Sequence, residues 1–311
     1  MFLGVDGGGT KTAYAIIDSH GRVRAQHVGP SVSHLIAGFA HAEHLLSEGI
    51  QAVLGKAELT AADLTFSFLG LPSYGEDSGT LDRLNGLPAS VLASDRYRCD
   101  SDMVCSWAGS LACADGISVI AGTGSMAFGE YQGRTARSGG WGEIIGDEGS
   151  AYWIAREGMN LFSRMSDGRA VRGPLYDLVR QRLEITTDLD LCARVYGAAV
   201  NARSAFAQFA PLVHDAARAG DVQATSIFHR AAAELVGCVL ATRRSLQIPE
   251  DVRVPVSHTG SVLEGATILI DAFKRGVATA RVPLEYRAPK YSPDIGAALY
   301  AARLSGVSLS I

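Results

Sequence analysis

Two glycine-rich segments, each following an apolar run, carry the residue types best suited to binding phosphate. The first is Asp6-Gly7-Gly8-Gly9-Thr10-Lys11-Thr12, and the second is Gly122-Thr123-Gly124-Ser125. Consecutive glycines let backbone N–H groups approach an anion closely, while the threonine and serine hydroxyls add donors and Lys11 adds charge. Asp6, at the end of a strand-like run, is placed to hold Mg²⁺ directly or through water. These residues predict binding of a nucleotide polyphosphate with its metal ion.

Neither segment fits the two best-known phosphate motifs. A Walker A loop needs Gly-Lys-Ser/Thr followed by a helix, but Thr10 separates Gly9 from Lys11 and residues 13–17 have the pattern of a strand. The second segment, with Ala127, matches Gly-x-Gly-x-x-Gly/Ala, yet a hairpin pattern follows it where that fingerprint requires a helix. An ordinary glycine-rich hairpin turn is the alternative for the first segment. As a pair, two such turns facing each other across a cleft could clamp a polyphosphate from both sides.

The elements that must position these turns repeat along the chain. Apolar runs and turn residues predict strands at 2–5, 13–17, 23–28, 64–69, 90–93, 117–121, 126–131, 134–138, 252–257 and 282–286. Helical spacing predicts helices at 38–55, from Asp102 to about Ala112, at 262–278 and at 293–305, with a mainly helical stretch from Asp147 to Leu246 broken near 166–174 and 184–190. Three strands joined by turns and followed by helices therefore occur twice. This order predicts two α/β halves with a cleft between them.

Composition and charge exclude several classes of function. The 311 residues are 47% hydrophobic and 19% charged, with a formal net charge of −4 and no cluster of lysine and arginine, so nucleic acid and anionic membrane surfaces are not expected partners. Charge-free stretches such as 117–129 fall short of the roughly 20 residues that span a bilayer. Met1 leads straight into the first strand, which predicts a cytoplasmic protein. The five cysteines contain no Cys-x-x-Cys, so buried free thiols are expected rather than a zinc or iron–sulfur framework.

Further segments give the chain a resemblance to a known family. Beside the two turns these are Gly139-Gly140-Trp141-Gly142, Gly146-Asp147-Glu148-Gly149-Ser150-Ala151-Tyr152-Trp153, His258-Thr259-Gly260-Ser261-Val262 and Ser292-Pro293-Asp294-Ile295-Gly296-Ala297-Ala298. Together they resemble the N-acetylglucosamine kinases, which belong to the BadF/BadG-type ATPase family of the actin, hexokinase and heat-shock ATPase superfamily. The resemblance implies an α/β fold of two ribonuclease-H-like (actin-like ATPase) domains with a nucleotide cleft between them. The N-terminal domain would contain residues 1–114 and a final helix at 293–311, and the C-terminal domain residues 115–292.

The resemblance also implies roles for the nucleotide-site residues. The first phosphate loop corresponds to Gly7 to Thr12, the second to Gly122 to Ser125, and the adenosine motif to Gly260 and Ser261. The family's catalytic base is an aspartate that starts a helix shortly before the second loop, which here is Asp102, with Asp100 as the alternative. An acid at this position also stabilises a helix start without any catalytic role. ATP and Mg²⁺ are the implied cofactors.

The implied substrate is a small sugar. By resemblance Asp147 would bind sugar hydroxyls, although a first-turn helix acid is the alternative. Ser33, His34, Gly140 and Tyr196 fall at sugar-site positions, with a purely structural role as the alternative for Tyr196. The family has an asparagine where this chain has Ser33. The expected product is N-acetylglucosamine 6-phosphate. Glucosamine kinase and an ATPase activator of a radical dehydratase are the alternatives, and the sequence leaves open whether the chain forms a homodimer.

Overall fold

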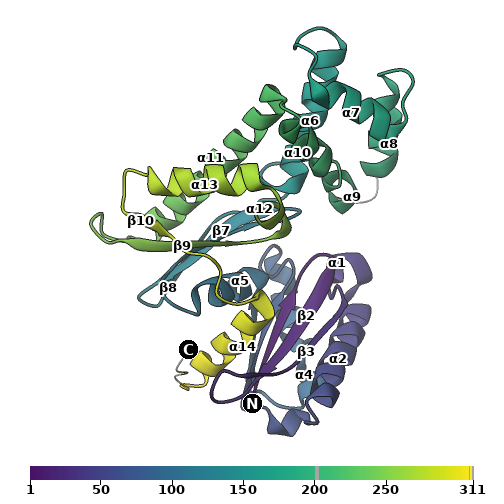
Figure 1. Ribbon diagram of the computed structural model, residues 1–311. Coiled ribbons are helices and arrows are strands. Elements are labelled where there is room, and N and C mark those ends of the chain that lie inside the picture. The colour runs from purple at the N-terminus through teal and green to yellow at the C-terminus, as the bar shows by residue number, and fades with distance from the viewer. Residues whose placement is uncertain (200–202, 308, 310–311) are drawn as a thin grey trace. The chain divides into compact units, whose positions relative to one another are not determined.

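The chain divides into two compact units. The computed structural model describes residues 1–199, 203–307 and 309 (Figure 1). One unit comprises Met1–Asp115 and Arg287–Ile311, and the other comprises Gly116–Tyr286. Each is described by itself below.

The first unit is built on a five-stranded mixed sheet. Its elements are β1 (Phe2–Gly7), β2 (Lys11–Ile17), β3 (Val23–Pro30), α1 (His34–Ala37), α2 (Phe39–Lys56), a 3₁₀ turn at Ala61–Asp63, β4 (Phe66–Leu71), a 3₁₀ turn at Ser78–Thr80, α3 (Leu81–Gly86), α4 (Ala89–Leu92), β5 (Tyr97–Ser101), α5 (Asp102–Leu111) and α14 (Pro293–Leu304). The strand order is β3-β2-β1-β4-β5, in which β1 and β2 are antiparallel while β1, β4 and β5 are parallel. The carboxyl ends of β1, β4 and β5 therefore meet at one edge.

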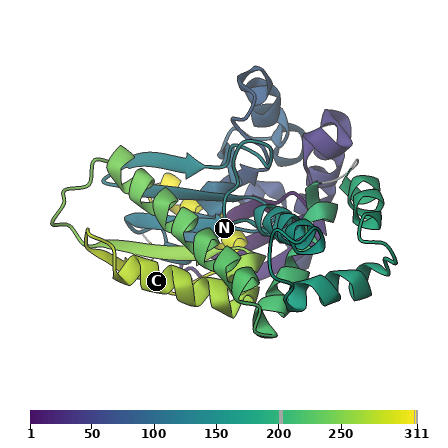
Figure 2. The same ribbon diagram turned by 90° about the horizontal axis from the view of Figure 1, so that it is seen from above.

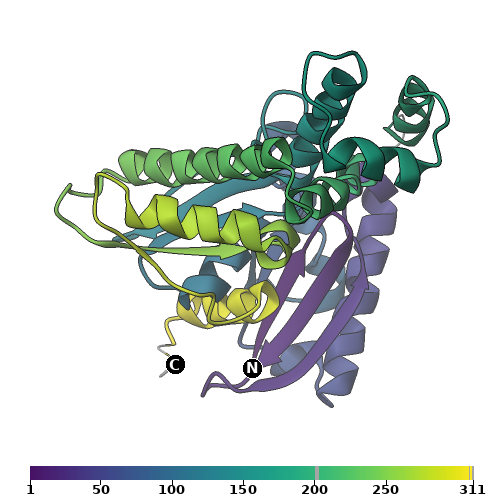
Figure 3. The ribbon, with the colours of Figure 1, turned by 45° about the horizontal axis from the view of Figure 1, so that its top comes forward.

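Strand alternation explains how helices cover both faces of this sheet. Val5 pairs with Tyr14, and the Tyr14 ring lies against Gly49 of α2. Gly4 and Ala15 point the other way, and Gly4 leaves room for the backbone of α14. Figure 3 shows α2 alongside the strands of this unit. The last helix of the chain is thus packed against the first strand.

The second unit repeats the same strand plan. Its elements are β6 (Gly116–Ala121), β7 (Ser125–Tyr131), β8 (Arg134–Gly139), α6 (Ala151–Ser166), α7 (Pro174–Leu183), α8 (Asp190–Ala199), α9 (Arg203–Ala207), α10 (Ala210–Arg218), α11 (Val222–Ser245), β9 (Val254–Thr259), α12 (Ser261–Gly265), α13 (Thr267–Ala278) and β10 (Leu284–Tyr286). Its sheet has the order β10-β9-β6-β7-β8, with β6 antiparallel to β7 and parallel to β9. The expected α/β fold with two actin-like domains is confirmed in its repeated topology.

Helices α11 and α13 lie side by side over the sheet of the second unit (Figures 2 and 3). Buried Ile227, Phe228 and Leu235 of α11 join buried Leu269 and Phe273 of α13 in one core. By length and composition α11 could cross a membrane, but 44% of its most apolar window is buried inside the protein. Core helices of this kind pass the same test, so the feature is weak evidence for a membrane span.

Two sequence-based expectations about elements are wrong, and one strand is not predicted. Residues 90–93 lie in and after the short helix α4, and the strand comes later, as β5. The sequence pattern does not indicate β5, because Arg98 and Asp100 interrupt its apolar character, and the strand is specified by pairing with β4 instead. The helix expected from Asp147 starts only at Ala151, after the N-cap Ser150.

Candidate active site

The first glycine turn is a tight hairpin in which the carbonyl groups of Gly8 and Lys11 accept hydrogen bonds from within the protein. Gly8 N–H donates to the Lys11 carbonyl at 2.9 Å, and Ser31 Oγ donates to the Gly8 carbonyl at 2.7 Å. Because a trans peptide opposes its C=O and N–H, the amide of Gly9 points away from Ser31. Gly9 is exposed, and a side chain there would meet no atom within 4 Å. The turn can therefore present backbone donors to an anion.

The flanking threonines of this turn differ in environment. Thr10 is exposed, as is Lys11. Thr12 is fully buried, and its Oγ1 accepts a hydrogen bond from Val32 N–H at 3.1 Å. The Thr12 side chain thus ties the turn to the segment that precedes α1.

Asp6 and Asp102 meet at the carboxyl edge of the parallel strands. Asp6 pairs in register with Gly70 of β4, which pairs with Asp100 of β5. A Cβ on Gly70 would lie 2.9 Å from Cα of Asp102, so the start of α5 contacts β4 directly. The missing side chain of Gly70 therefore lets Asp102 approach the strand that carries Asp6.

The two aspartates proposed as base differ in their surroundings. Asp100 accepts hydrogen bonds from Arg98 Nη2 at 3.1 Å and from Ser101 N–H at 2.8 Å. Asp102 accepts one from Ser101 Oγ at 3.1 Å, and burial raises its pKa to about 6. That pKa value includes a raising effect of the Glu76 charge and a lowering effect of the hydrogen bonds from Ser101 and Met103. A carboxylate whose pKa approaches neutrality suits proton transfer, and Asp102 has this feature, whereas Asp100 is paired with the Arg98 guanidinium.

The surroundings of Asp6 favour a cation. Burial raises the pKa of Asp6 well above its usual range, and the nearby carboxyls of Asp102 and Asp294 raise it further against the opposing charge of Lys11. Asp294, itself buried at the start of α14, accepts a hydrogen bond from Gln26 Nε2 at 2.7 Å. Among the described residues no group of three or more His, Cys, Asp or Glu side chains could hold a metal ion alone. A Mg²⁺ ion that takes one carboxylate together with phosphate oxygens fits this arrangement.

The expected sugar segment lies between β3 and α1. Ser33 is the N-cap of α1 and is buried, and the His34 ring packs at a tilt against Phe39, with 4.6 Å between centroids. Nδ1 of His34 is buried without a hydrogen-bond partner among the described residues. Leu35 and Ile36 are exposed, at 67% and 74%. The segment thus offers one unsatisfied polar atom beside uncovered apolar surface.

In the second unit, the start of α6 orients the second glycine turn. The Gly122 carbonyl accepts from Ala151 N–H at 2.9 Å, and the Thr123 carbonyl accepts from Tyr152 N–H at 3.4 Å. These bonds satisfy donors that a helix start leaves free. The amides of Thr123 and Gly124, in the same peptide units, consequently point away from α6. This turn, like the first, can therefore present backbone N–H groups to an anion.

The predicted adenosine motif lies beside this turn. β6 and β9 are parallel, with Ile120 paired to Thr259, so both end at the same edge of the sheet. Gly260 has φ of 103°, and a side chain there would collide with the backbone of Ala121. Gly260 and Ser261 therefore lie next to the Gly122 turn, at the edge where parallel α/β sheets bind ligands.

Asp147 is an ion-paired, buried residue rather than a first-turn helix acid. It has φ of 58°, is 1% exposed and precedes α6. One carboxylate oxygen makes a short ion pair with Nη2 of Arg203, and the other accepts from Ser125 N–H at 3.4 Å. Burial raises the Asp147 pKa, against the lowering effect of Arg203. Arg203 Nε also contacts Glu143 Oε2 at 3.2 Å.

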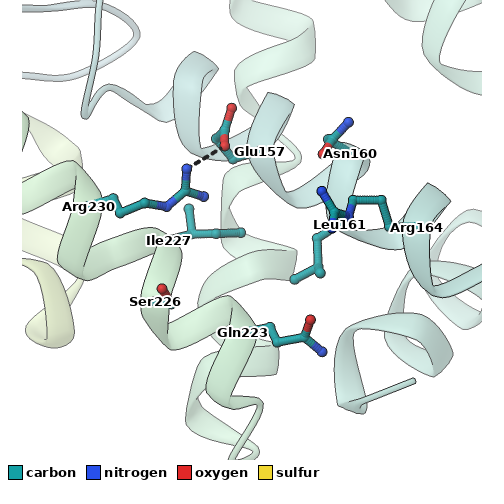
Figure 4. Close-up of a pocket in the computed structure, with 8 residues that line it drawn as sticks. All are labelled: Glu157, Asn160, Leu161, Arg164, Gln223, Ser226, Ile227 and Arg230. Carbon is teal, nitrogen blue, oxygen red and sulfur yellow. Dashed lines mark hydrogen bonds and ion pairs between the residues drawn. The ribbon is translucent and has the colours of Figure 1, made fainter. Parts of the chain in front are cut away.

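The remaining predicted sugar residues are placed less completely. Gly140 has φ of 71°, and its N–H donates to the Ser125 carbonyl at 3.0 Å, so it joins the cluster around the second turn. The backbone of Tyr196 belongs to α8, but its side chain lies outside the described part of the chain. A separate pocket of about 320 Å³ lies between α6 and α11 and contains none of the predicted residues (Figure 4).

Sequence reasoning missed three residues of these clusters. Arg203 lies against Gly124 and Asp147, but a single arginine in a helical stretch carries no motif. Gly70 is an isolated glycine inside a strand pattern, which does indicate a close backbone approach. Asp294 follows Ser292-Pro293, a recognisable helix start, although its proximity to Asp6 depends on the fold.

Comparison with known proteins is consistent with this geometry. The model of the BadF/BadG/BcrA/BcrD ATPase family matches residues 3–301. N-acetyl-D-glucosamine kinase of Dictyostelium discoideum is 27% identical over 310 residues, which cover 97% of each protein. N-acetylmuramic acid/N-acetylglucosamine kinase of Clostridium acetobutylicum is 29% identical over 280 residues, covering 88% of this chain and 89% of that protein.

Solved structures show the same architecture. A candidate N-acetylglucosamine kinase from Chromobacterium violaceum has a TM-score of 0.73 at 25% identity, covering 96% of this chain and 98% of that one. A ROK hexokinase from Thermus thermophilus has a TM-score of 0.58 at 15% identity, covering 96% and 97%. At that identity the second similarity indicates a shared fold alone.

Proposed function

This chain belongs to the BadF/BadG/BcrA/BcrD ATPase family, and from that membership we propose that it is an ATP-dependent N-acetylglucosamine kinase. The observation that supports the proposal most directly is Asp102, a carboxylate at the start of a helix with a pKa of about 6. It lies near Asp6, and it can pack close to β4 because Gly70 has no side chain. The two relatives that match most of the chain are named as kinases of N-acetylated amino sugars.

In the proposed reaction Asp102 accepts the proton of the sugar 6-hydroxyl as that oxygen attacks the γ-phosphorus of ATP. The bond from the γ-phosphorus to the bridging oxygen of the β-phosphate breaks, and ADP leaves. Gly9, Thr123 and Gly124 supply backbone amides for the phosphates, Lys11 adds charge, and Gly260 with Ser261 contacts the adenosine. Asp6 would hold Mg²⁺, which neutralises phosphate charge when bound. Phosphoryl transfer depends mainly on such positioning and charge stabilisation. We propose that the enzyme acts in the cytoplasm on a small sugar, without a nucleic-acid or membrane partner.

The test is a coupled ATP-consumption assay with a panel of hexoses, hexosamines and N-acetylhexosamines. N-acetylglucosamine should stimulate consumption of ATP and yield one 6-phosphate per ADP. If no sugar in the panel stimulated ATP consumption, the kinase assignment would have to be abandoned. The activator alternative needs accessible clustered thiols, whereas Cys99 and Cys105 are buried and burial raises the pKa of each.

We expect kcat/KM for N-acetylglucosamine to exceed that for glucosamine by about tenfold or more, because one desolvated contact is worth roughly 1–3 kcal/mol. Exposed Leu35 or Ile36 can cover the acetyl methyl, and Ser33 can bond the amide. No acidic side chain occurs between Asp18 and Glu43 to attract a free ammonium group. Steady-state kinetics on both sugars measure the ratio. Equal or better turnover of glucosamine would transfer the assignment to a glucosamine kinase.

We also expect kcat/KM to fall about tenfold per pH unit below pH 6, with a plateau above it. Asp102 acts as a base only when ionised, and its pKa is about 6, so protonation at lower pH removes the base. The terminal phosphate of the free nucleotide ionises in a similar range, about 6 by analogy with a phosphate monoester, so Asp102→Asn serves as the control. The residual rate of that variant should retain only the nucleotide's ionisation. Identical acid limbs in both proteins would contradict the assignment.

A further inference from the structure

Arg203 is ion-paired with Asp147, the carboxylate proposed to bind the sugar hydroxyls. Both oxygens of Asp147 are engaged, one by Arg203 Nη2 and the other by Ser125 N–H. The Asp147 side chain is 2% exposed, whereas that of Arg203 is 39% exposed. Each oxygen of Asp147 thus already accepts one donor, and the buried position of the carboxylate keeps a sugar hydroxyl from reaching the lone pairs that remain. Asp147 becomes available only if Arg203 moves or shares it.

Arg203 also lies directly against the second glycine turn. A side chain on Gly124 would collide with its Nη2, so the guanidinium occupies the space that Gly124 leaves open. The Thr123 and Gly124 amides expose donors at the same turn, and an anion bound to them would lie within reach of the guanidinium. Arginine binds phosphate oxygens through two parallel N–H groups, as it does carboxylates. A nucleotide phosphate would therefore compete with Asp147 for Arg203.

The backbone of Arg203 is fixed by the packing of α9, so a change of partner needs movement of the Arg203 side chain alone. Arg203 begins α9, and Phe206 of the same helix is buried with its ring 4.9 Å from that of Tyr152 in α6. Arg203 Nε holds a second acid, Glu143, at 3.2 Å. Glu143 is 30% exposed and offers an alternative partner while Nη2 leaves Asp147.

We propose that Arg203 is a nucleotide-responsive latch. Without nucleotide it binds Asp147; with ATP present it turns to the phosphates at the Gly122–Ser125 turn, and Asp147 is released to bind sugar hydroxyls. Arg203 is thus a phosphate-binding residue that controls when the sugar site is complete. The inference rests on the proposed kinase function for the sugar half, while the phosphate half stands on the turn itself. It predicts that nucleotide tightens sugar binding, and by reciprocity that sugar tightens nucleotide binding.

The two halves of the ion pair should respond in opposite directions in nucleotide binding. Arg203→Gln should weaken the affinity for the non-hydrolysable analogue AMPPNP by about tenfold and leave adenosine affinity unchanged, because a charged contact to phosphate is lost. Asp147→Asn should tighten binding of AMPPNP, because Nη2 of Arg203 then has no carboxylate to leave before it turns to the phosphates. Isothermal titration calorimetry without sugar measures both. If the ion pair had only a structural role, both variants would bind AMPPNP more weakly or both would bind it with unchanged affinity. Either result would overturn the latch.

The second measurement is the coupling between sugar and nucleotide. For the natural protein the Kd of N-acetylglucosamine should fall about tenfold when AMPPNP is present. In Arg203→Gln the ratio of the Kd values without and with AMPPNP should approach one. Without nucleotide, this variant should bind the sugar more tightly than the natural protein does. An unchanged ratio would refute the latch. Arg230→Gln is the matched control, because Arg230 is an exposed arginine paired with Glu157 at 2.9 Å in the separate pocket of the same unit (Figure 4). Its two affinities and their ratio should match those of the natural protein.

These outcomes separate the latch from the proposed function. If the natural protein neither bound nor phosphorylated any sugar, the kinase proposal would fail, while the opposite responses of the two variants to AMPPNP would still test the phosphate half. If the natural protein phosphorylated N-acetylglucosamine but the Arg203→Gln coupling ratio were unchanged, only the latch would fail. Thermal melting of each variant verifies folding before titration.

Discussion

Replacing Asp102 by asparagine is expected to lower kcat by about 10²–10⁴ while the Kd for ATP stays nearly constant. Asparagine keeps the shape and the hydrogen bond from Ser101, but it cannot accept the proton of the attacking hydroxyl. The effect should therefore appear in the transition state rather than in ground-state binding. Single-turnover kinetics with ATP and N-acetylglucosamine measure it, and calorimetry measures nucleotide affinity in parallel.

The stability of this variant provides the control, because a catalytic loss must not come from unfolding. The pKa of Asp102 is raised to about 6 in the folded protein, above its usual value near 4. Ionisation of Asp102 therefore lowers the free energy of unfolding as pH rises from about 4 to about 6, with the full loss above pH 6 and none below pH 4. Asp102→Asn removes that cost and should be as stable as the natural protein or more stable, by at most about 3 kcal/mol at pH 7.5. The difference should vanish below pH 4. Retained turnover would instead assign the base elsewhere, with Asp100 tested next.

Local patterns were enough to predict the turns and the elements that carry them. The run Asp6 to Thr12 and the run Gly122 to Ser125 each lie between apolar segments of strand length, so their hairpins follow from neighbouring residues alone. The helix beginning at Asp102 has its N-cap, Ser101, immediately before it. The repeat of three strands and following helices likewise shows the two-domain α/β plan, because the period-2 and period-3.6 patterns recur in the same order.

Contacts between distant segments could not be predicted in this way. Arg203 reaches Asp147 across 56 positions of the sequence, and nothing near either residue specifies the pairing. Asp294 influences Asp6 only because α14 returns to pack on β1. β5 was missed for the same reason, since a strand with two charged residues is specified by its neighbour β4. Resemblance to a family supplies roles for single positions, but the partners of those positions come from the fold.

Gly70→Ala is expected to lower kcat/KM by about 10², although Gly70 has no side chain that could take part in the reaction. The added Cβ would lie 2.9 Å from Cα of Asp102 and would also meet Sγ of Cys105, and a carbon atom needs more room than the backbone contact allows. The start of α5 must then shift away from β4 and take Asp102 with it. Misplacement of a catalytic group by about 1 Å costs on the order of 10² in rate. Overpacking should also lower stability by about 1–3 kcal/mol.

A second substitution separates these two collisions. In the double variant Gly70→Ala/Cys105→Ala the side-chain collision is relieved, whereas the contact between the new Cβ and Cα of Asp102 remains. Stability should therefore recover substantially while kcat/KM stays low. Gly55→Ala in α2 is the matched control, because a Cβ there meets no atom within 4 Å, and it should leave activity unchanged and raise stability by about 0.5–1 kcal/mol. If the double variant regained full activity, crowding of Cys105 rather than displacement of Asp102 would be the cause, and Gly70 would have no direct part in positioning the base.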